Sequence, residues 1–241
     1  MIKTIAFDAD DTLWENENFY QDAHVEYVQL MNKYGSDQEV LEHLHRIDVG
    51  NISRYGYGVK SFVLGMIEAA VEISEGKLSA EDTTAIIGIG DKLLNYPINV
   101  LPNVERVLKD FRARFNLIAI TKGDLLDQNG KMDRSGLRNY FDEVVVVSEK
   151  DEASYEAVLQ QRGILPEEFL MVGNSIKSDV QPVINIGGYG VHVPFRLTWH
   201  HEEGNIDETQ SRLIQIKEID EILNIDLLAN HVEQIYVAVN P

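Results

Sequence analysis

Residues 2–13 read IKTIAFDADDTL, and this stretch decides the fold class. Its first half, up to Phe7, is a short and nearly continuous apolar run, which is typical of a strand buried on both faces of a sheet. Asp8 ends the run, and Asp10 and Asp11 follow at once. The stretch therefore predicts a buried parallel strand with carboxylates at its carboxyl end.

Similar apolar runs recur later in the chain. They are residues 116–121, 143–148, 169–173 and 190–194. Segments with apolar residues at helical spacing separate them, the first capped by Asn103 and the second closed by Gly163. Strands that alternate with helices indicate βαβ units. We expect an α/β protein with a doubly wound, Rossmann-like parallel sheet.

Residues 15–98 interrupt this alternation. They carry apolar stripes at helical spacing but no convincing strand, and Ser79 is placed to cap the third stripe. We expect an all-helical cap domain over residues 15–98, inserted into an α/β core domain of residues 1–14 and 99–241.

The C-terminal region gives weaker signals. Residues 213–216 favour an edge strand and residues 218–223 a short helix, whereas residues 235–239 fit either. Adjacent His200 and His201 lie beside two glutamates, but neighbouring side chains on a loop point apart, so we interpret them as a solvated loop rather than a metal site.

The charge balance narrows the choice of partners. The 241 residues include 21 Lys and Arg against 40 Asp and Glu, which gives a net charge of −19. Such a surface repels nucleic acid phosphates and anionic lipid, so we expect neither as a partner. The chain has no cysteine, which excludes disulfides and thiolate sites, and no signal peptide or membrane-spanning run is expected. We expect a cytoplasmic protein, and its oligomeric state stays open.

Chemically active residues follow the predicted strands where each one ends. They are Asp8, Asp10, Thr121, Lys122, Gly123, Lys150, Asn174 and Asp179. In an open parallel sheet these ends meet at one edge, where ligands bind. Carboxylates, a hydroxyl beside a glycine turn and lysines together can hold a divalent cation and a phosphoryl group, and a carboxylate can attack phosphorus.

The order of these motifs resembles the four-motif signature of the haloacid dehalogenase superfamily. The matching motifs are Asp8-Ala9-Asp10-Asp11-Thr12-Leu13, then Thr121, then Lys150, then Gly173-Asn174-Ser175 with Asp179. The resemblance covers about residues 1–224, and the helical insertion stands where this family carries its C1 caps. Asp10 makes the chain similar to the phosphatases of the family, because the dehalogenases of the family lack an aspartate at this position.

The resemblance implies a Mg²⁺-dependent phosphatase that hydrolyses a small phosphorylated metabolite through an aspartyl phosphate. Asp8 would be the nucleophile and Asp10 the general acid and base. Thr121, Lys122, Gly123 and Lys150 would bind the phosphoryl group. The metal would be held by Asp8, Asp10 through its backbone carbonyl, Asn174 and Asp179.

Two residues depart from the family pattern. Asn174 stands where the family usually has an aspartate, so its oxygen can ligate Mg²⁺ but brings no charge, and Asp179 would contribute more. Lys122 stands where a small polar residue is usual, and it either adds a cation near the phosphate or points into solvent. Lys122, Lys131 and Lys177 compete with Lys150 for the catalytic role, although a surface position is the default for a lysine.

Other hypotheses remain open at this point. One is a dehalogenase or phosphonate-cleaving enzyme of the same fold, and another is a non-catalytic relative that only binds a phosphorylated ligand. A receiver-type phosphoacceptor is disfavoured by the chain length and the helical insertion. Trp14 either lines a substrate pocket between cap and core or packs within the cap.

Overall fold

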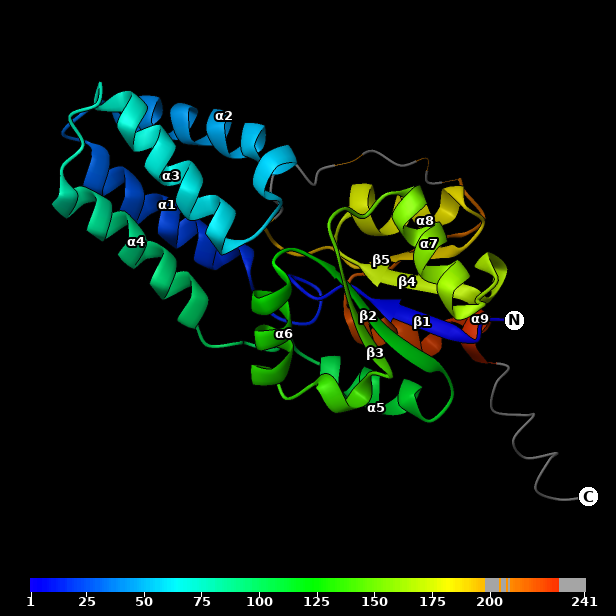
Figure 1. Ribbon diagram of the computed structural model, residues 1–241. Helices are drawn as coiled ribbons and strands as arrows, with labels where there is room; N and C mark the ends of the chain where they lie inside the picture. Colours follow the sequence, from blue (N-terminus) through cyan, green and yellow to red (C-terminus); the bar gives the residue numbers. More distant parts are fainter. Residues whose placement is uncertain (198–203, 205–206, 208, 230–241) are drawn as a thin grey trace, which may run out of the picture. The chain divides into compact units, whose positions relative to one another are not determined.

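Two compact units make up the chain in the computed structural model (Figure 1), which describes residues 1–197, 204, 207 and 209–229. One unit comprises Met1–Glu15, Ile98–Thr121 and Lys131–Pro241, and the other comprises Asn16–Pro97 and Lys122–Gly130. We call them the sheet unit and the helical unit. Residues 122–130, which follow the second predicted strand, thus group with the helical unit.

A six-stranded sheet in the order β3-β2-β1-β4-β5-β6 forms the centre of the sheet unit. Its strands are β1 (Thr4–Phe7), β2 (Asn116–Lys122), β3 (Glu143–Val147), β4 (Phe169–Gly173), β5 (Tyr189–His192) and β6 (Leu213–Gln215). β1 pairs in parallel with β2 on one side and with β4 on the other, and β5 is parallel to both of its neighbours. This order is that of Rossmann folds, so the predicted fold class is confirmed.

The side chains of β1 alternate between two apolar cores, one on each face of the sheet. Ile5 and Phe7 join the core that includes α5 (Val104–Arg112), whereas Ala6 joins the core that includes α7 (Glu152–Arg162). Other helical segments are α6 (Leu125–Arg134), η1 (Arg138–Tyr140), η2 (Pro166–Glu168), the π-helix η3 (Ile176–Val180), α8 (Gln181–Asn185), η5 (Ile219–Asn224) and α9 (Asp226–Ala229). Burial on both faces explains why the strand is continuously apolar.

The helix ends agree with two of the three predicted caps. Gly163 ends α7 in the left-handed conformation, and the Ser79 side chain accepts a hydrogen bond from the backbone of Asp82. The Asn103 cap is wrong: Asn103 precedes α5 in a left-handed backbone conformation, with φ of 64°, and its side chain makes no cap hydrogen bond. Side-chain capping needs an extended backbone at that position, which Asn103 does not have.

The helical unit contains α1 (Glu17–Met31), α2 (Asp37–Tyr55), α3 (Val59–Ile73) and α4 (Ala80–Asn95). Their buried faces share one apolar core, in which Tyr27 and Met66 are fully buried. Helix α2 is not among the helices predicted from the sequence. This helix begins at a capping box of Ser36 and Glu39, and its apolar stripe is short because Val40 and Leu44 are its buried apolar residues.

The C-terminal predictions are met in part. The expected strand and short helix are present as β6 and η5. The histidine and glutamate cluster at residues 200–203 and the segment 235–239 lie outside the described residues. Among the residues that are described, no helix combines the length and apolarity needed to cross a bilayer.

Two glycines of α4 allow a matched test of packing in the helical unit. A Cβ at Gly88 would meet no atom within 4 Å, whereas a Cβ at Gly90 would overlap the side chain of Val63 on α3. We expect Gly88→Ala to raise the free energy of unfolding by up to about 1 kcal/mol, because alanine favours a helix over glycine. We expect Gly90→Ala to lower it by about 1–3 kcal/mol through overpacking. Urea denaturation followed by circular dichroism measures both, and equal shifts in the two variants would contradict the close α3–α4 contact.

Candidate active site

The turn after β1 fixes Asp8 at the carboxyl edge of the sheet. The Asp8 N–H donates a hydrogen bond to the carbonyl oxygen of Val172 on β4 at 2.9 Å. The chain then doubles back, with the Leu13 N–H donating to the carbonyl of Ala9 at 2.8 Å and Asp11 in a left-handed conformation at φ 63°. Aspartate tolerates this conformation better than most residues. The acidic sequence of the turn therefore suits its backbone as well as its chemistry.

Lys150 lies between the carboxylates of Asp8 and Asp179. Its Nζ donates to Oδ1 of Asp179 at 2.7 Å and also to Oδ1 of Asp8. The side chains of Lys150, Asp8 and Asp179 are 2%, 10% and 1% exposed. Charges this deeply buried are rare unless they are paired. The ends of β1, β3 and β4 are thus tied together by one buried ionic cluster.

The pKa of Asp8 is raised to about 7, mainly by burial; the charges of Asp179 and Asp10 also raise it, whereas Lys150 lowers it. Burial alone would lower the pKa of Lys150, but Asp179 and Asp8 hold that pKa well above its ordinary value. The ammonium therefore stays charged at neutral pH. An opposite charge nearby favours the ionised form of a carboxylate, so Lys150 favours the charged form of Asp8.

The hydroxyl of Thr12 connects the turn after β1 to the turn after β4. Thr12 Oγ1 donates to Oδ2 of Asp8 at 2.9 Å and accepts a hydrogen bond from the Asn174 N–H at 3.1 Å. The side-chain oxygen of Asn174 lies 3.3 Å from the same hydroxyl. The sequence pattern predicts no separate role for Thr12, because its partner Asn174 comes 162 residues later in the chain.

Gly173 makes room for Asp179. A Cβ at Gly173 would overlap the Asp179 side chain, whose Oδ2 accepts a hydrogen bond from the Ser175 N–H at 3.0 Å. Asp179 belongs to η3, a short π-helix that follows the Ser175 cap. The glycine at the end of β4 and the widened turn after it together direct Asp179 toward Lys150.

The predicted phosphate-binding residues are divided between the two units. Thr121 is buried in the sheet unit, where Phe7 pairs with Ala119, so Asp8 and Thr121 follow that pair on adjacent strands. Lys122 and Gly123 group with the helical unit. There the Nζ of Lys122 lies 4.3 Å from the centre of the Tyr57 ring.

Asp10 has two strong partners within the sheet unit. Lys131 Nζ donates to its two carboxylate oxygens at 2.7 and 2.8 Å, and the Trp14 indole N–H donates to Oδ1 at 2.8 Å. Lys131 is buried, so the surface position expected for it is wrong. Trp14 is fully buried in the core of the sheet unit, so the predicted packing within the helical insertion is wrong. No sequence pattern near Lys131 predicts its contact with Asp10.

The donor set fits the hard cation that the sequence implies. Asp8 and Asp179 converge on one ammonium, and the Asn174 amide oxygen lies on the Thr12 side of Asp8. Oxygen ligands of this kind are those that Mg²⁺ prefers. Among the described residues no three His, Cys, Asp or Glu side chains form a metal site by themselves. The amide, backbone carbonyls and water would therefore complete the coordination.

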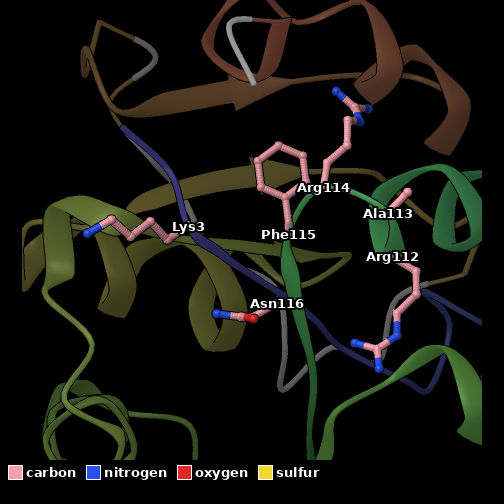
Figure 2. A pocket seen from close by; sticks show the side chains of 6 residues that line it. All are labelled: Lys3, Arg112, Ala113, Arg114, Phe115 and Asn116. Atoms are coloured by element: carbon pink, nitrogen blue, oxygen red, sulfur yellow. The ribbon is translucent and has the colours of Figure 1, made fainter. Parts of the chain in front are cut away.

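A recess at the opposite end of the strands differs from the Asp8 edge in the residues that line it. Figure 2 shows its lining, which is Lys3, Arg112, Ala113, Arg114, Phe115 and Asn116. Lys3 pairs with Glu168 at 2.6 Å, and the two arginines pair with Asp142 and Asp110. Its cations are thus already neutralised by carboxylates, and the recess lies at the amino ends of β1 and β2 rather than at the edge that carries Asp8.

Comparisons with known proteins agree with this geometry. The sequence model of a family described as haloacid dehalogenase-like hydrolase matches residues 2–187. A glyceraldehyde 3-phosphate phosphatase of Methanothermobacter thermautotrophicus is 26% identical over 91% of this chain and 100% of its own length. The human N-acylneuraminate-9-phosphatase is 21% identical over 77% of this chain and 79% of its own.

A solved structure extends the comparison to the fold. The crystal structure of a haloacid dehalogenase-like family hydrolase from Xanthomonas campestris is 33% identical, with a TM-score of 0.83. The match covers 97% of this chain and 94% of that one. This chain and the Xanthomonas campestris hydrolase are therefore similar in both sequence and fold over nearly their whole lengths.

The ionic cluster predicts a specific stability defect. Replacing Lys150 with Met leaves two buried carboxylates without their shared cation, so we expect a loss of about 3–5 kcal/mol in the free energy of unfolding. Adding Asp8→Asn to Lys150→Met removes one of the two charges and is expected to recover part of that loss. Chemical denaturation in chelator-treated buffer measures the effect, with the exposed Lys109→Met as control. A Lys150→Met protein as stable as the control would contradict the cluster.

Proposed function

The chain belongs to the haloacid dehalogenase-like hydrolases, and on that premise we propose that it is a Mg²⁺-dependent phosphatase of small phosphorylated metabolites. The observation that carries the proposal is the buried Asp8 carboxylate, which lies beside the Lys150 ammonium at the carboxyl edge of the sheet. A carboxylate placed next to a fixed positive charge can approach an anionic phosphoryl group, which an isolated buried carboxylate would repel.

Asp8 is proposed as the nucleophile. Its oxygen attacks phosphorus while the bond from phosphorus to the ester oxygen breaks, and the leaving oxygen takes a proton from the carboxyl group of Asp10. The product is an aspartyl phosphate on Asp8 and the free alcohol. Water then attacks the same phosphorus, Asp10 accepts its proton, and the bond from Asp8 to phosphorus breaks to release inorganic phosphate.

The remaining residues of the site hold charge and orientation. Lys150 keeps a permanent positive charge next to Asp8, because Asp179 shares its ammonium. The Thr12 hydroxyl donates a hydrogen bond to one carboxylate oxygen of Asp8. This bond also fixes the orientation of the other carboxylate oxygen, because the two belong to one planar group. We propose that Thr121, with Lys122 and Gly123 after it, contributes the hydroxyl and backbone groups that bind the phosphoryl oxygens.

We propose that Asp8, Asp179, the amide of Asn174 and the backbone carbonyl of Asp10 hold Mg²⁺. When bound, the cation supplies positive charge that neutralises the phosphoryl oxygens. The substitution of an amide for a carboxylate at position 174 leaves two charged ligands, Asp8 and Asp179, for the divalent ion.

The substrate class follows from the relatives and from the helical unit. The two compared phosphatases are named for glyceraldehyde 3-phosphate and an N-acylneuraminate 9-phosphate, which are both small hydroxylated phosphate monoesters. We propose that the helical unit is a cap domain that limits substrate size and excludes water. A folded phosphoprotein should therefore be a poor substrate.

Removing the proposed nucleophile tests the function directly. We expect Asp8→Asn to reduce phosphate release from a panel of small phosphate esters by at least about 1,000-fold, a barrier increase of about 4 kcal/mol. The release should require Mg²⁺ in the native protein and be unchanged in Asp91→Asn, which alters an exposed aspartate of α4. Equal activity in Asp8→Asn would remove Asp8 from its role. Halide or fluoride release without phosphate release would favour a dehalogenase.

Restoring a carboxylate at position 174 tests the metal assignment. Asn174→Asp adds a negative charge beside Asp8 and Asp179, so we expect Mg²⁺ to reach half-maximal activation at a several-fold lower concentration. The same charge should make the metal-free protein less stable. Activity titrations with Mg²⁺ and thermal unfolding in chelator measure the two effects. Half-maximal activation at an unchanged or higher Mg²⁺ concentration would contradict a role for residue 174 at the metal.

A further inference from the structure

Asp10 is held from two sides by residues that the proposed mechanism does not use. Lys131 binds both carboxylate oxygens, at 2.7 and 2.8 Å, and the Trp14 indole N–H binds one of them at 2.8 Å. The Lys131 side chain is 11% exposed, although lysine seldom lies this deep. A two-oxygen contact restricts the rotation of the carboxylate, which a single hydrogen bond does not.

Both partners of Asp10 are themselves fixed by the core of the sheet unit. Trp14 is fully buried, its carbonyl accepts a hydrogen bond from the Asp11 N–H at 2.7 Å, and it forms a bridge with Val100. Lys131 is followed by Met132, which is buried in the same apolar core. The two donors therefore reach Asp10 from segments anchored in this core, one from the turn that carries Asp10 and the other from the end of α6.

We propose that Lys131 and Trp14 are positioning residues, which orient the carboxyl group of Asp10 for proton transfer to the leaving oxygen. This inference rests on the proposed function. Neither residue touches the reacting atoms in this role, and Lys131 acts through its two contacts with Asp10. Proton transfer in the transition state depends on the direction of the donor as well as on its presence, so a freely rotating carboxyl group would protonate the leaving group less often.

The leaving group of the substrate reports on this orientation. An alkyl ester leaves as a strongly basic alkoxide and needs the proton, whereas p-nitrophenolate leaves readily without one. General acid catalysis contributes about 10²–10⁴-fold where the proton is needed. A defect in the orientation of Asp10 should therefore be large for alkyl phosphates and small for p-nitrophenyl phosphate. A general structural defect should reduce both to the same extent.

The experiment compares kcat/KM of the Mg²⁺-loaded enzyme for p-nitrophenyl phosphate and for glycerol 3-phosphate, because kcat/KM includes the step in which the leaving group departs. For Lys131→Met we expect a loss of about 100-fold with the alkyl ester and of less than about 10-fold with the aryl ester. Lys131→Arg, which keeps a cation, should restore most of the alkyl activity. Lys109→Met, on the exposed face of α5, should leave both rates unchanged.

Trp14→Phe provides a second test that does not remove a buried charge, so it covers the case in which Lys131→Met does not fold. We expect it to show the same preference for the aryl ester, to a smaller extent. Equal losses with the two esters in the folded variants, or no loss with either, would overturn the positioning role and leave the proposed function intact. A native enzyme that releases phosphate from neither ester would overturn both.

Discussion

The sharing of one ammonium by two buried carboxylates is the constraint on which the sheet unit depends. Asp8 and Asp179 would repel each other at the end of β1 and β4, and Lys150 makes their proximity stable. The cluster draws on residues that stand far apart in the chain: Asp8 directly follows β1, Lys150 follows β3, and Asp179 lies on η3 after β4. A parallel sheet supplies this arrangement because its strands all end at the same edge. The fold is therefore the means by which three charges from distant segments become neighbours.

The order of the strands explains why this edge is suited to chemistry. The chain adds β2 and β3 on one side of β1 and then returns to add β4 on the other side. The connections diverge at β1, and in such sheets ligands bind in the crevice that this divergence leaves at the carboxyl ends of the strands. Asp8 occupies the end of that central strand, and the Thr12 hydroxyl links the turn after β1 to the turn after β4. The point where the strand connections diverge is therefore also the point where the charged side chain of Asp8 lies.

The sequence is informative where a residue's environment depends on its neighbours along the chain. Continuous apolar runs predict strands buried on both faces, and the residues that end these runs predict the Asp8 edge. The sequence is silent where a partner comes from elsewhere. Lys131 resembles any surface lysine until the fold brings it to Asp10. Similarly, α2 buries few apolar side chains, and its capping box alone was too weak a signal to reveal it. The grouping of residues 122–130 with the helical unit also depends on contacts that no local pattern records.

The π-helix η3 makes the segment after β4 sensitive to chain length rather than to residue type. Ser175 to Asp179 spans one wide turn, and this spacing brings the Asp179 carboxylate back to the Ser175 N–H and to Lys150. Loss of a single residue from the turn would rotate every following side chain around the helix axis. Related chains should therefore vary in the identity of the intervening residues far more readily than in their number, and an alignment that opens a gap here would misplace the carboxylate.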